Sequence, residues 1–238
     1  MSTNLLDLGT GYSEQSGFTF PESLSDKYKP KRVRKFMVAF PRNVMLSLLA
    51  SPRPGAYYFL GASGLGKTEM ALAFANELPA QVHHIASKDC DLEAVRKIKL
   101  ACHYVPHDIF NPDRRCRMHV VIVDEADQMS KPAQLAFLSL LDATGFPPNT
   151  IFIFTGNSRD GLEDRFMSRV KLLPFSKEGM SGEISNLLAS IWEREGGTVE
   201  NAPNFARLVK DSKNNIRDAV NTLEIELMAL PTPETETV

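Results

Sequence analysis

Cysteine is scarce in this 238-residue chain, and long hydrophobic runs and a strong net charge are absent. The three cysteines, Cys90, Cys102 and Cys116, have no CxxC spacing, which argues against a disulfide scaffold or a zinc ribbon. We interpret them as packing thiols in a reducing compartment. No apolar run approaches the roughly 18 residues of a membrane helix, and the first residues lack the basic and apolar regions of a signal peptide. We therefore expect no membrane partner.

The composition is nevertheless that of a folded protein. Hydrophobic residues make up 43% of the chain and the formal net charge is only −2, whereas disordered chains are poorer in apolar residues and further from neutrality. Both ends carry acids and no base, so the segment between them is net basic. Residues 1–24 are predicted to form a flexible arm and residues 231–238 a flexible tail.

Apolar runs alternate with amphipathic stretches in the first two thirds of the chain. Runs that are nearly continuous in apolar residues are typical of strands buried on both faces. They lie at 57–60, 82–86, 119–124 and 151–156. Helical periodicity follows at 71–78 and 133–141, and Ser130 is suited to cap the second helix. The alternation predicts an α/β domain with a parallel sheet over residues 25–175.

The strand-like pattern stops after about residue 175. Residues 178–194, 203–211 and 215–229 have the spacing of three helices. We therefore predict a small helical domain over residues 176–230 that follows the sheet domain.

The segment GASGLGKT at 61–68 matches the phosphate-binding pattern G-x-x-x-x-G-K-[ST] between a strand and a helix. Its glycines let the backbone curl so that N–H groups point at phosphate oxygens, and the helix N-terminus adds partial positive charge. Lys67 would reach the β- and γ-phosphates, and the Thr68 hydroxyl would ligate Mg²⁺. The predicted loop comprises Gly61, Ala62, Ser63, Gly64, Leu65, Gly66, Lys67 and Thr68.

Two acids end the apolar run HVVIVDEAD at 119–127. Ligands of open α/β sheets sit at the carboxyl ends of the strands, so Asp124 can hold Mg²⁺ there and Glu125 can polarise a water. The alternative is a solubilising turn. Together with the phosphate loop, the pair predicts hydrolysis of a nucleoside triphosphate with Mg²⁺ as cofactor.

Further motifs resemble those of AAA+ ATPases, and in particular the small subunits of sliding-clamp loaders. IFIFTGN at 151–157 is similar to the sensor-1 strand, and LEDRFMSR at 162–169 to the SRC motif. NNIRDAVNTLE at 214–224 is similar to the sensor-2 helix, and SDKYKPKRV at 25–33 to the box that begins such subunits. The resemblance covers roughly residues 24–230 and implies that the nucleotide is ATP.

The resemblance implies a role for one residue in each motif. Asn157 would orient the attacking water, Arg217 would reach the γ-phosphate of its own subunit, and Arg169 would act as a finger on the ATP of a neighbour. Tyr28 and Pro30 would lie near the adenine. The alternatives are a turn cap for Asn157, an ion pair of Arg169 with Asp164 or Glu163, and a solvated Arg217. Arg165 is a rival for the finger.

The resemblance also implies partners. These are other AAA+ subunits in a homo- or hetero-oligomer, a sliding clamp and primer–template DNA. The expected location is the cytoplasm, the cytoplasm of a host cell for a phage protein, or the nucleus for a eukaryotic one. DNA would pass Lys88, Ser130 and Lys131. The third, helical collar domain usual in such subunits is not evident, so another AAA+ ATPase such as a helicase loader, or an assembly subunit with little turnover, is the alternative. His83 and His84 are predicted to fill the core or a sheet edge rather than bind metal.

Overall fold

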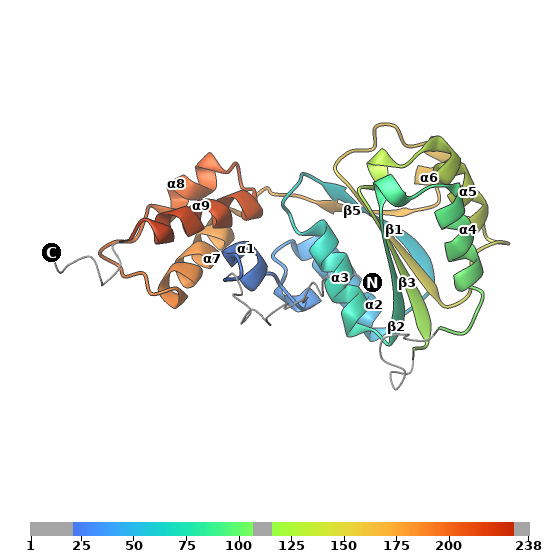
Figure 1. Ribbon diagram of the computed structural model, residues 1–238, viewed down its shortest axis with the longest axis horizontal. Coiled ribbons are helices and arrows are strands. Elements are labelled where there is room, and N and C mark those ends of the chain that lie inside the picture. The colour runs from blue at the N-terminus through green and yellow to red at the C-terminus, as the bar shows by residue number, and fades with distance from the viewer. Residues whose placement is uncertain (1–20, 107–115, 231–238) are drawn as a thin grey trace, which may run out of the picture.

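The computed structural model describes residues 21–106 and 116–230 of the chain. They form a larger body around a β-sheet and a smaller body of helices, which lie side by side along the longest axis (Figure 1). The predicted tail and most of the predicted arm lie outside the described residues. Leu24, the last residue of that arm, is buried and begins the short helix α1 (Leu24–Lys27).

The sheet has five strands in the order β2-β3-β4-β1-β5, and each neighbouring pair is parallel. The strands are β1 (Gly55–Gly61), β2 (Ala80–Ala86), β3 (Met118–Asp124), β4 (Thr150–Gly156) and β5 (Lys171–Phe175). Each of the four predicted apolar runs falls within one of the first four strands. The predicted parallel α/β fold is therefore confirmed.

Strand β5 is the one that the apolar pattern does not predict. Its sequence, KLLPF, is short and contains Pro174, which lacks the N–H group of a ladder donor. The strand lies at the edge of the sheet and pairs only with β1, which is where a proline is tolerated. Its buried side chains, Leu173 and Phe175, complete the core beside β1.

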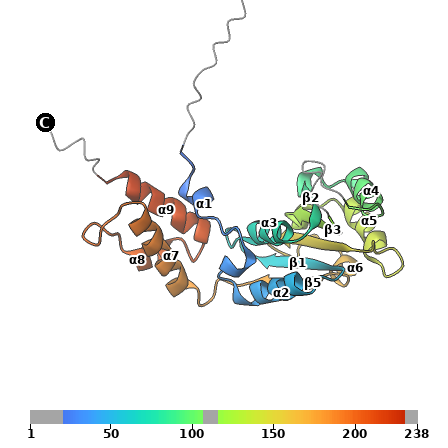
Figure 2. The same ribbon diagram turned by 90° about the horizontal axis from the view of Figure 1, so that it is seen from below.

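Helices cover both faces of the sheet (Figure 2). Tyr57 and Phe59 of β1 belong to the core under α2 and α3, whereas Tyr58 belongs to the core under α4, α5 and α6. The alternation follows from the two-residue period of a strand. The helices are α2 (Ala39–Ala50), α3 (Lys67–Glu77), α4 (Leu92–Ala101), α5 (Lys131–Leu141) and α6 (Asp164–Met167), with short 3₁₀ turns η1 (Val33–Lys35), η2 (Ser87–Asp89) and η3 (Ala126–Gln128).

Helix α5 shows how local sequence sets an element boundary. The Ser130 side chain accepts a hydrogen bond from the N–H of Ala133, as predicted, and Pro132 occupies the first turn. Gln134, buried in the same helix, donates to the carbonyl oxygens of Met129 and Gly161, and its Oε1 accepts the N–H of Glu163. One amide side chain therefore fastens α5 to the loop before α6.

The smaller body consists of α7 (Ser181–Arg194), α8 (Phe205–Asp211) and α9 (Ile216–Met228). These bounds lie inside the three predicted helical ranges. Apolar side chains from each helix, such as Leu188, Val209 and Leu223, are buried against one another. Helix α1 packs on α9, where the N–H of Leu24 donates to the Glu224 carboxylate over 3.0 Å.

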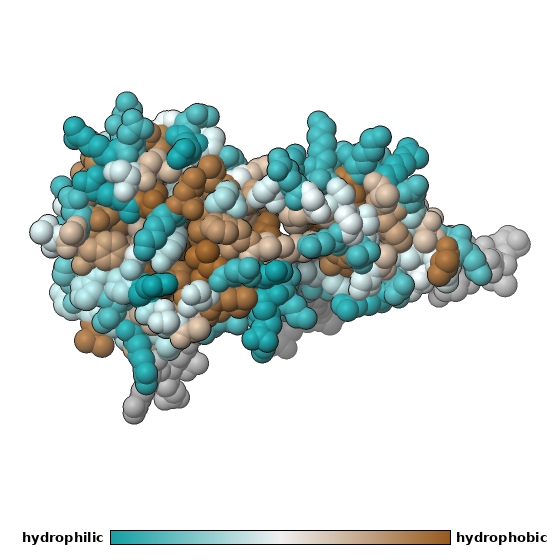
Figure 3. All heavy atoms as spheres, turned by 180° about the vertical axis from the view of Figure 1, so that it is seen from behind, coloured by the Kyte–Doolittle hydropathy of each residue, from teal (hydrophilic) through white to brown (hydrophobic). Residues whose placement is uncertain are grey.

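Apolar side chains gather across the middle of the larger body on the face turned away from the viewer of Figure 1, as Figure 3 shows. Contiguous apolar surface of this kind is typical of contacts with another chain. Within the described ranges, no helix has both the length and the apolar character needed to cross a membrane.

Candidate active site

The predicted phosphate loop joins β1, which ends at Gly61, to α3, which begins at Lys67. Gly64 and Gly66 both have φ of 77°, a left-handed conformation that glycine adopts without strain. A Cβ atom at Gly61 would lie 2.3 Å from the carbonyl oxygen of Phe175, so the packing against β5 also requires glycine there. The loop therefore exposes backbone N–H groups at the start of α3, the arrangement that binds phosphate.

Lys67 is buried beneath this loop. Its ammonium group donates to the carbonyl oxygens of Gly61 and Ala62, at 2.8 and 2.9 Å, and to Oδ1 of Asn157 at 2.9 Å. Burial lowers the pKa of Lys67, and the negative charges of Asp127 and Asp124 oppose that shift. A cation held by neutral oxygens in this way can exchange them for the charged oxygens of a phosphate.

Asp124, the last residue of β3, lies next to the loop. Its Oδ1 atom accepts hydrogen bonds from the hydroxyls of Thr68, at 2.6 Å, and Thr155, at 2.5 Å. A hydroxyl and a carboxylate in contact form the hard-oxygen donor set that Mg²⁺ prefers. The residues that the sequence predicts as ligands, Thr68 and Asp124, therefore fit a magnesium ion.

Glu125 follows with φ of 51°, an uncommon conformation for a residue other than glycine. Its N–H donates to Oγ1 of Thr155 at 3.1 Å, which holds the turn, while its side chain is exposed. Such backbone strain costs about 1–3 kcal/mol and is concentrated at active sites. The exposed Glu125 side chain can therefore contact water.

Asp127 positions the segment that follows β4. Its Oδ2 atom accepts the N–H groups of Asn157, at 3.0 Å, and Ser158, at 3.3 Å. Its Oδ1 atom is buried without a hydrogen-bond partner among the described residues. Sequence reasoning missed this residue, although its spacing three positions after Asp124 was a usable signal.

A cleft of about 540 Å³ opens beside the phosphate loop. Its walls come from the segment around α1 and η1, from the loop and from α7 and α9, and they include Tyr28, Pro30 and Arg217. The smaller body reaches the loop directly, because a Cβ atom on Gly64 would lie 1.9 Å from Oδ1 of Asn215 at the start of α9. The structure thus brings together the predicted adenine-side residues, the loop and the predicted sensor-2 arginine.

Glu195, just after α7, ties the smaller body to the segment around α1. Its carboxylate lies 2.7 Å from the ammonium group of Lys27 and accepts a hydrogen bond from the Tyr28 hydroxyl. The hydrogen bond from Lys27, which has the larger effect, and the hydrogen bond from Tyr28 hold the pKa of Glu195 below its ordinary value. Sequence reasoning missed Glu195, since no local pattern links residues so far apart in the chain.

Arg169 is not part of this cluster. Arg169 lies just before β5. Because Lys171 pairs with Tyr57, Arg169 lies at the amino-terminal end of the strands, whereas the phosphate loop follows their carboxyl end. The separation along the strands is on the order of 20 Å at about 3.3 Å per residue. Its guanidinium donates to Asp142 at 2.7 and 2.8 Å and to the carbonyl oxygen of Arg165 at 2.8 Å. The acid that it pairs with is Asp142, not Asp164 or Glu163 as the alternative had it.

The residues predicted to face DNA all follow the carboxyl ends of strands. Lys88 belongs to η2 after β2, and Lys131 is the first residue of α5 after β3, with Ser130 as its cap. All three are exposed, and η2 contacts η3. They therefore lie near the same surface, beside the helix N-terminus of α5.

Comparison with known proteins places the sheet domain in a family. The profile of the "ATPase family associated with various cellular activities (AAA)" matches residues 57–175. A replication factor C small subunit 2 of Pyrobaculum islandicum is 29% identical over 168 residues, which cover 70% of this chain and 51% of that protein. The sliding-clamp-loader large subunit of Enterobacteria phage T4 is 23% identical over 210 residues, or 84% of this chain and 63% of that protein.

Solved structures show the same fold. A variant of Thermotoga maritima RuvB superposes with a TM-score of 0.61 at 14% identity, covering 84% of this chain and 72% of that chain. A structure described as a DNA replication initiation factor superposes with a TM-score of 0.61 at 14% identity, covering 82% of this chain and 63% of that chain. The chain spans only about half to two thirds of the length of the curated relatives cited above.

Proposed function

The chain belongs to the AAA family of ATPases, and from that premise we propose that it is an ATP-hydrolysing subunit of a DNA sliding-clamp loader. The observation that carries the ATPase part is the meeting of Lys67, Thr68 and Asp124 with Glu125 and Asn157 at the carboxyl edge of the sheet. The clamp-loader part rests on the curated relatives named for that role.

The nucleotide would lie with its phosphates on residues 61–68 and its base toward Tyr28 and Pro30 in the cleft. Lys67 would turn from the loop carbonyls to the β- and γ-phosphates, and Thr68 and Asp124 would hold Mg²⁺, which supplies charge neutralisation at the phosphates. Glu125 would accept the proton of a water that Asn157 orients for attack on the γ-phosphorus. Catalysis would consist of positioning and charge stabilisation.

One guanidinium would come from the same chain and one from a neighbour. Arg217 lines the cleft beside Gly64 and Gly66, which supports a contact with the phosphates of its own chain. Arg169 lies at the far edge of the sheet, so it could serve only the nucleotide of an adjoining subunit. Binding of ATP would then close the interface between subunits, and hydrolysis would loosen it. The exposed apolar face in Figure 3 is consistent with such an assembly.

The experiment measures ATP hydrolysis by the full chain alone, with a sliding clamp encoded by the same genome, and with that clamp plus primer–template DNA. We expect turnover that the clamp and DNA together stimulate. Glu125→Gln should keep ATP binding, measured by equilibrium dialysis, and lose turnover, because only the proton acceptor changes. Glu178→Gln, at an exposed acid outside the cleft, is the matched control.

Two results would contradict the proposal in different ways. Equal turnover by Glu125→Gln and wild type would remove Glu125 from the chemistry. ATPase activity that neither clamp nor DNA changes, with no clamp retained in a pull-down, would leave an ATPase of the family and exclude the clamp-loader role.

A further inference from the structure

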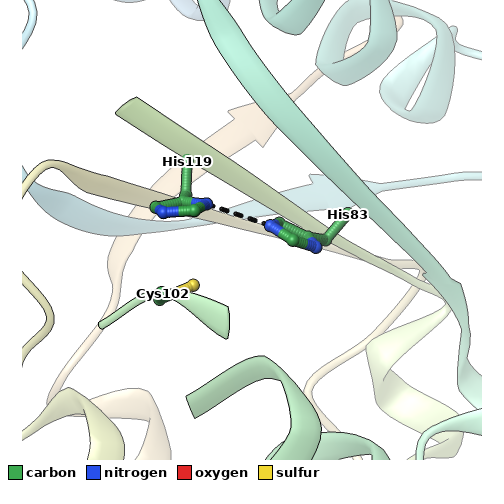
Figure 4. A group of neighbouring side chains, drawn as sticks. All are labelled: His83, Cys102 and His119. Atoms are coloured by element: carbon green, nitrogen blue, oxygen red, sulfur yellow. Dashed lines mark hydrogen bonds between the residues drawn. The ribbon is translucent and has the colours of Figure 1, made fainter. Parts of the chain in front are cut away.

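Two histidines and a cysteine meet at the end of the sheet away from the phosphate loop (Figure 4). His83 lies in β2, His119 is the second residue of β3, and Cys102 follows α4 directly. Because Gln81 pairs with His119 and His83 with Val121, the two histidines are diagonal neighbours on one face of the sheet. The Cys102 sulfur points toward the two rings in Figure 4.

The spacing of the three donor atoms is close to that of a metal site. Nε2 of His83 and Nδ1 of His119 are 3.1 Å apart. One ring nitrogen of each histidine and the Cys102 sulfur all lie within 4.8 Å of one another. Tetrahedral bonds of about 2.0–2.1 Å to nitrogen and about 2.3 Å to sulfur require donors roughly 3.3–3.7 Å apart. An ion would therefore need only small side-chain shifts.

His119 is already oriented as a ligand. Its Nε2 atom lies 3.0 Å from the carbonyl oxygen of Tyr104, so that nitrogen carries the proton and donates. Nδ1 is then unprotonated, and its lone pair accepts the N–H group of Nε2 of His83. A backbone carbonyl on the distal ring nitrogen is the usual support of a metal-bound histidine. His119 and Cys102 are buried and His83 is partly exposed, which leaves a route from solvent.

We propose that Nε2 of His83, Sγ of Cys102 and Nδ1 of His119 bind one Zn²⁺ ion, with water in the fourth tetrahedral position. Two imidazoles and a thiolate are the ligands that zinc prefers over Mg²⁺ or Ca²⁺. On binding, the Cys102 thiol releases its proton to solvent, and the proton on Nε2 of His83 moves to Nδ1, so one proton leaves in total. The ion would fasten the edge strand β2 and the end of α4 to β3, at a distance from the ATP site.

The test is a titration of the metal-free full chain with Co²⁺ as a spectroscopic substitute for Zn²⁺. We expect one equivalent to bind, with the d–d bands of a tetrahedral ion and a sulfur-to-cobalt charge-transfer band, and Zn²⁺ to displace it. Cys102→Ser should lose the charge-transfer band, and His83→Gln should weaken Zn²⁺ binding by at least about 100-fold, because substitutions beyond the ligands already cost 10–100-fold. Cys90→Ser, at another buried cysteine, should bind like wild type.

Thermal unfolding gives a second measurement that does not depend on ATP hydrolysis. Zn²⁺ should raise the Tm of wild type and of Cys90→Ser but not that of Cys102→Ser, because an ion that binds only the folded chain stabilises it. Absence of the charge-transfer band in wild type, or unchanged affinity in folded His83→Gln, would overturn the proposal. The cluster would then be a hydrogen-bonded histidine pair beside a packing thiol.

Discussion

The ammonium nitrogen of Lys67 lies 2.9 Å from Oδ1 of Asn157, although 90 residues separate them in the chain. The contact exists because β1 and β4 are neighbours, with Leu60 paired to Gly156, so the loop after one strand meets the residue after the other. The N–H of Asn157 is in turn held by Asp127. An acid after β3, an amide after β4 and a lysine after β1 thus form one hydrogen-bonded chain.

Asp127→Ala should lower turnover while ATP binding persists. Without the carboxylate, the N–H groups of Asn157 and Ser158 lose their acceptor, and the Asn157 side chain is no longer held beside Lys67. We expect kcat to fall about tenfold or more, since 1.4 kcal/mol of lost positioning corresponds to a factor of ten. Steady-state kinetics would show a change in kcat with little change in KM.

Asp127→Asn should recover part of that loss, because an amide oxygen can still accept the two N–H groups. Asp160→Ala, at an exposed acid in the same loop, is the matched control. If Asp127→Ala raised KM and left kcat intact, Asp127 would act on nucleotide binding and not on the position of Asn157.

Gly64→Ala should destabilise the protein and weaken ATP binding. Gly64 has φ of 77°, and an added Cβ would lie 1.9 Å from Oδ1 of Asn215, so the Asn215 side chain that caps α9 must give way. Backbone strain of this kind costs about 1–3 kcal/mol before the clash is counted. Urea unfolding would measure the loss, and binding of a fluorescent ATP analogue would report the cleft.

The control for that substitution is Gly182→Ala in α7, where an added Cβ meets nothing within 4 Å. Alanine there should stabilise the fold by roughly 0.5–1 kcal/mol, as expected in a helix. Gly64→Ala with the stability and affinity of wild type would mean that the loop tolerates a side chain and that its turn is not the one described.

The sequence predicts those parts of the site that depend on local order. The spacing of 61–68 fixes a turn between a strand and a helix, and Asp124 ends an apolar run, so parallel pairing alone brings them to the same edge. The contacts of Asp127 with Asn157, Glu195 with Lys27, and Arg169 with Asp142 join distant segments. No periodicity in the sequence encodes such pairs. The apolar pattern does not predict strand β5 because the strand contains Pro174, and a proline is tolerated there only because β5 lies at the edge of the sheet.

The contact of Glu195 with Lys27 and Tyr28 predicts a dependence of stability on pH. The pKa of Glu195 is lowered in the folded chain, so the contact stabilises the fold above the ordinary carboxyl pKa of 4.5 and is lost as pH falls through the lower folded value. Glu195→Gln should therefore be less stable than wild type at pH 7. The two should converge below pH 4.5, measured by urea unfolding at a series of pH values.

Glu193→Gln, at an exposed acid two residues earlier and within α7, should follow wild type throughout that series. If the free energies of unfolding of Glu195→Gln and wild type differ by the same amount at every pH down to below pH 4.5, the carboxylate charge contributes nothing to holding α1 against the smaller body.

Arg169→Ala should keep ATP binding and lose turnover in the assembled oligomer. Asp142 holds the Arg169 side chain at the amino-terminal end of the strands, away from the phosphate loop of the same chain. The arginine can therefore contribute only to the site of a neighbouring subunit. Loss of an arginine finger lowers the rate about 10³–10⁵-fold in comparable NTPases. A single-turnover measurement of ATP hydrolysis on the complex would detect it.

Mixing two inactive variants tests whether the arginine acts between subunits. A subunit with Arg169→Ala retains Glu125, and a subunit with Glu125→Gln retains Arg169, so an interface that combines the intact halves carries both groups. Mixed oligomers should therefore regain a fraction of wild-type turnover, as shared active sites require. If Arg169→Ala instead keeps wild-type turnover, while Arg165→Ala loses turnover and complements Glu125→Gln, the finger is Arg165, whose carbonyl oxygen accepts a hydrogen bond from Arg169 in the isolated chain.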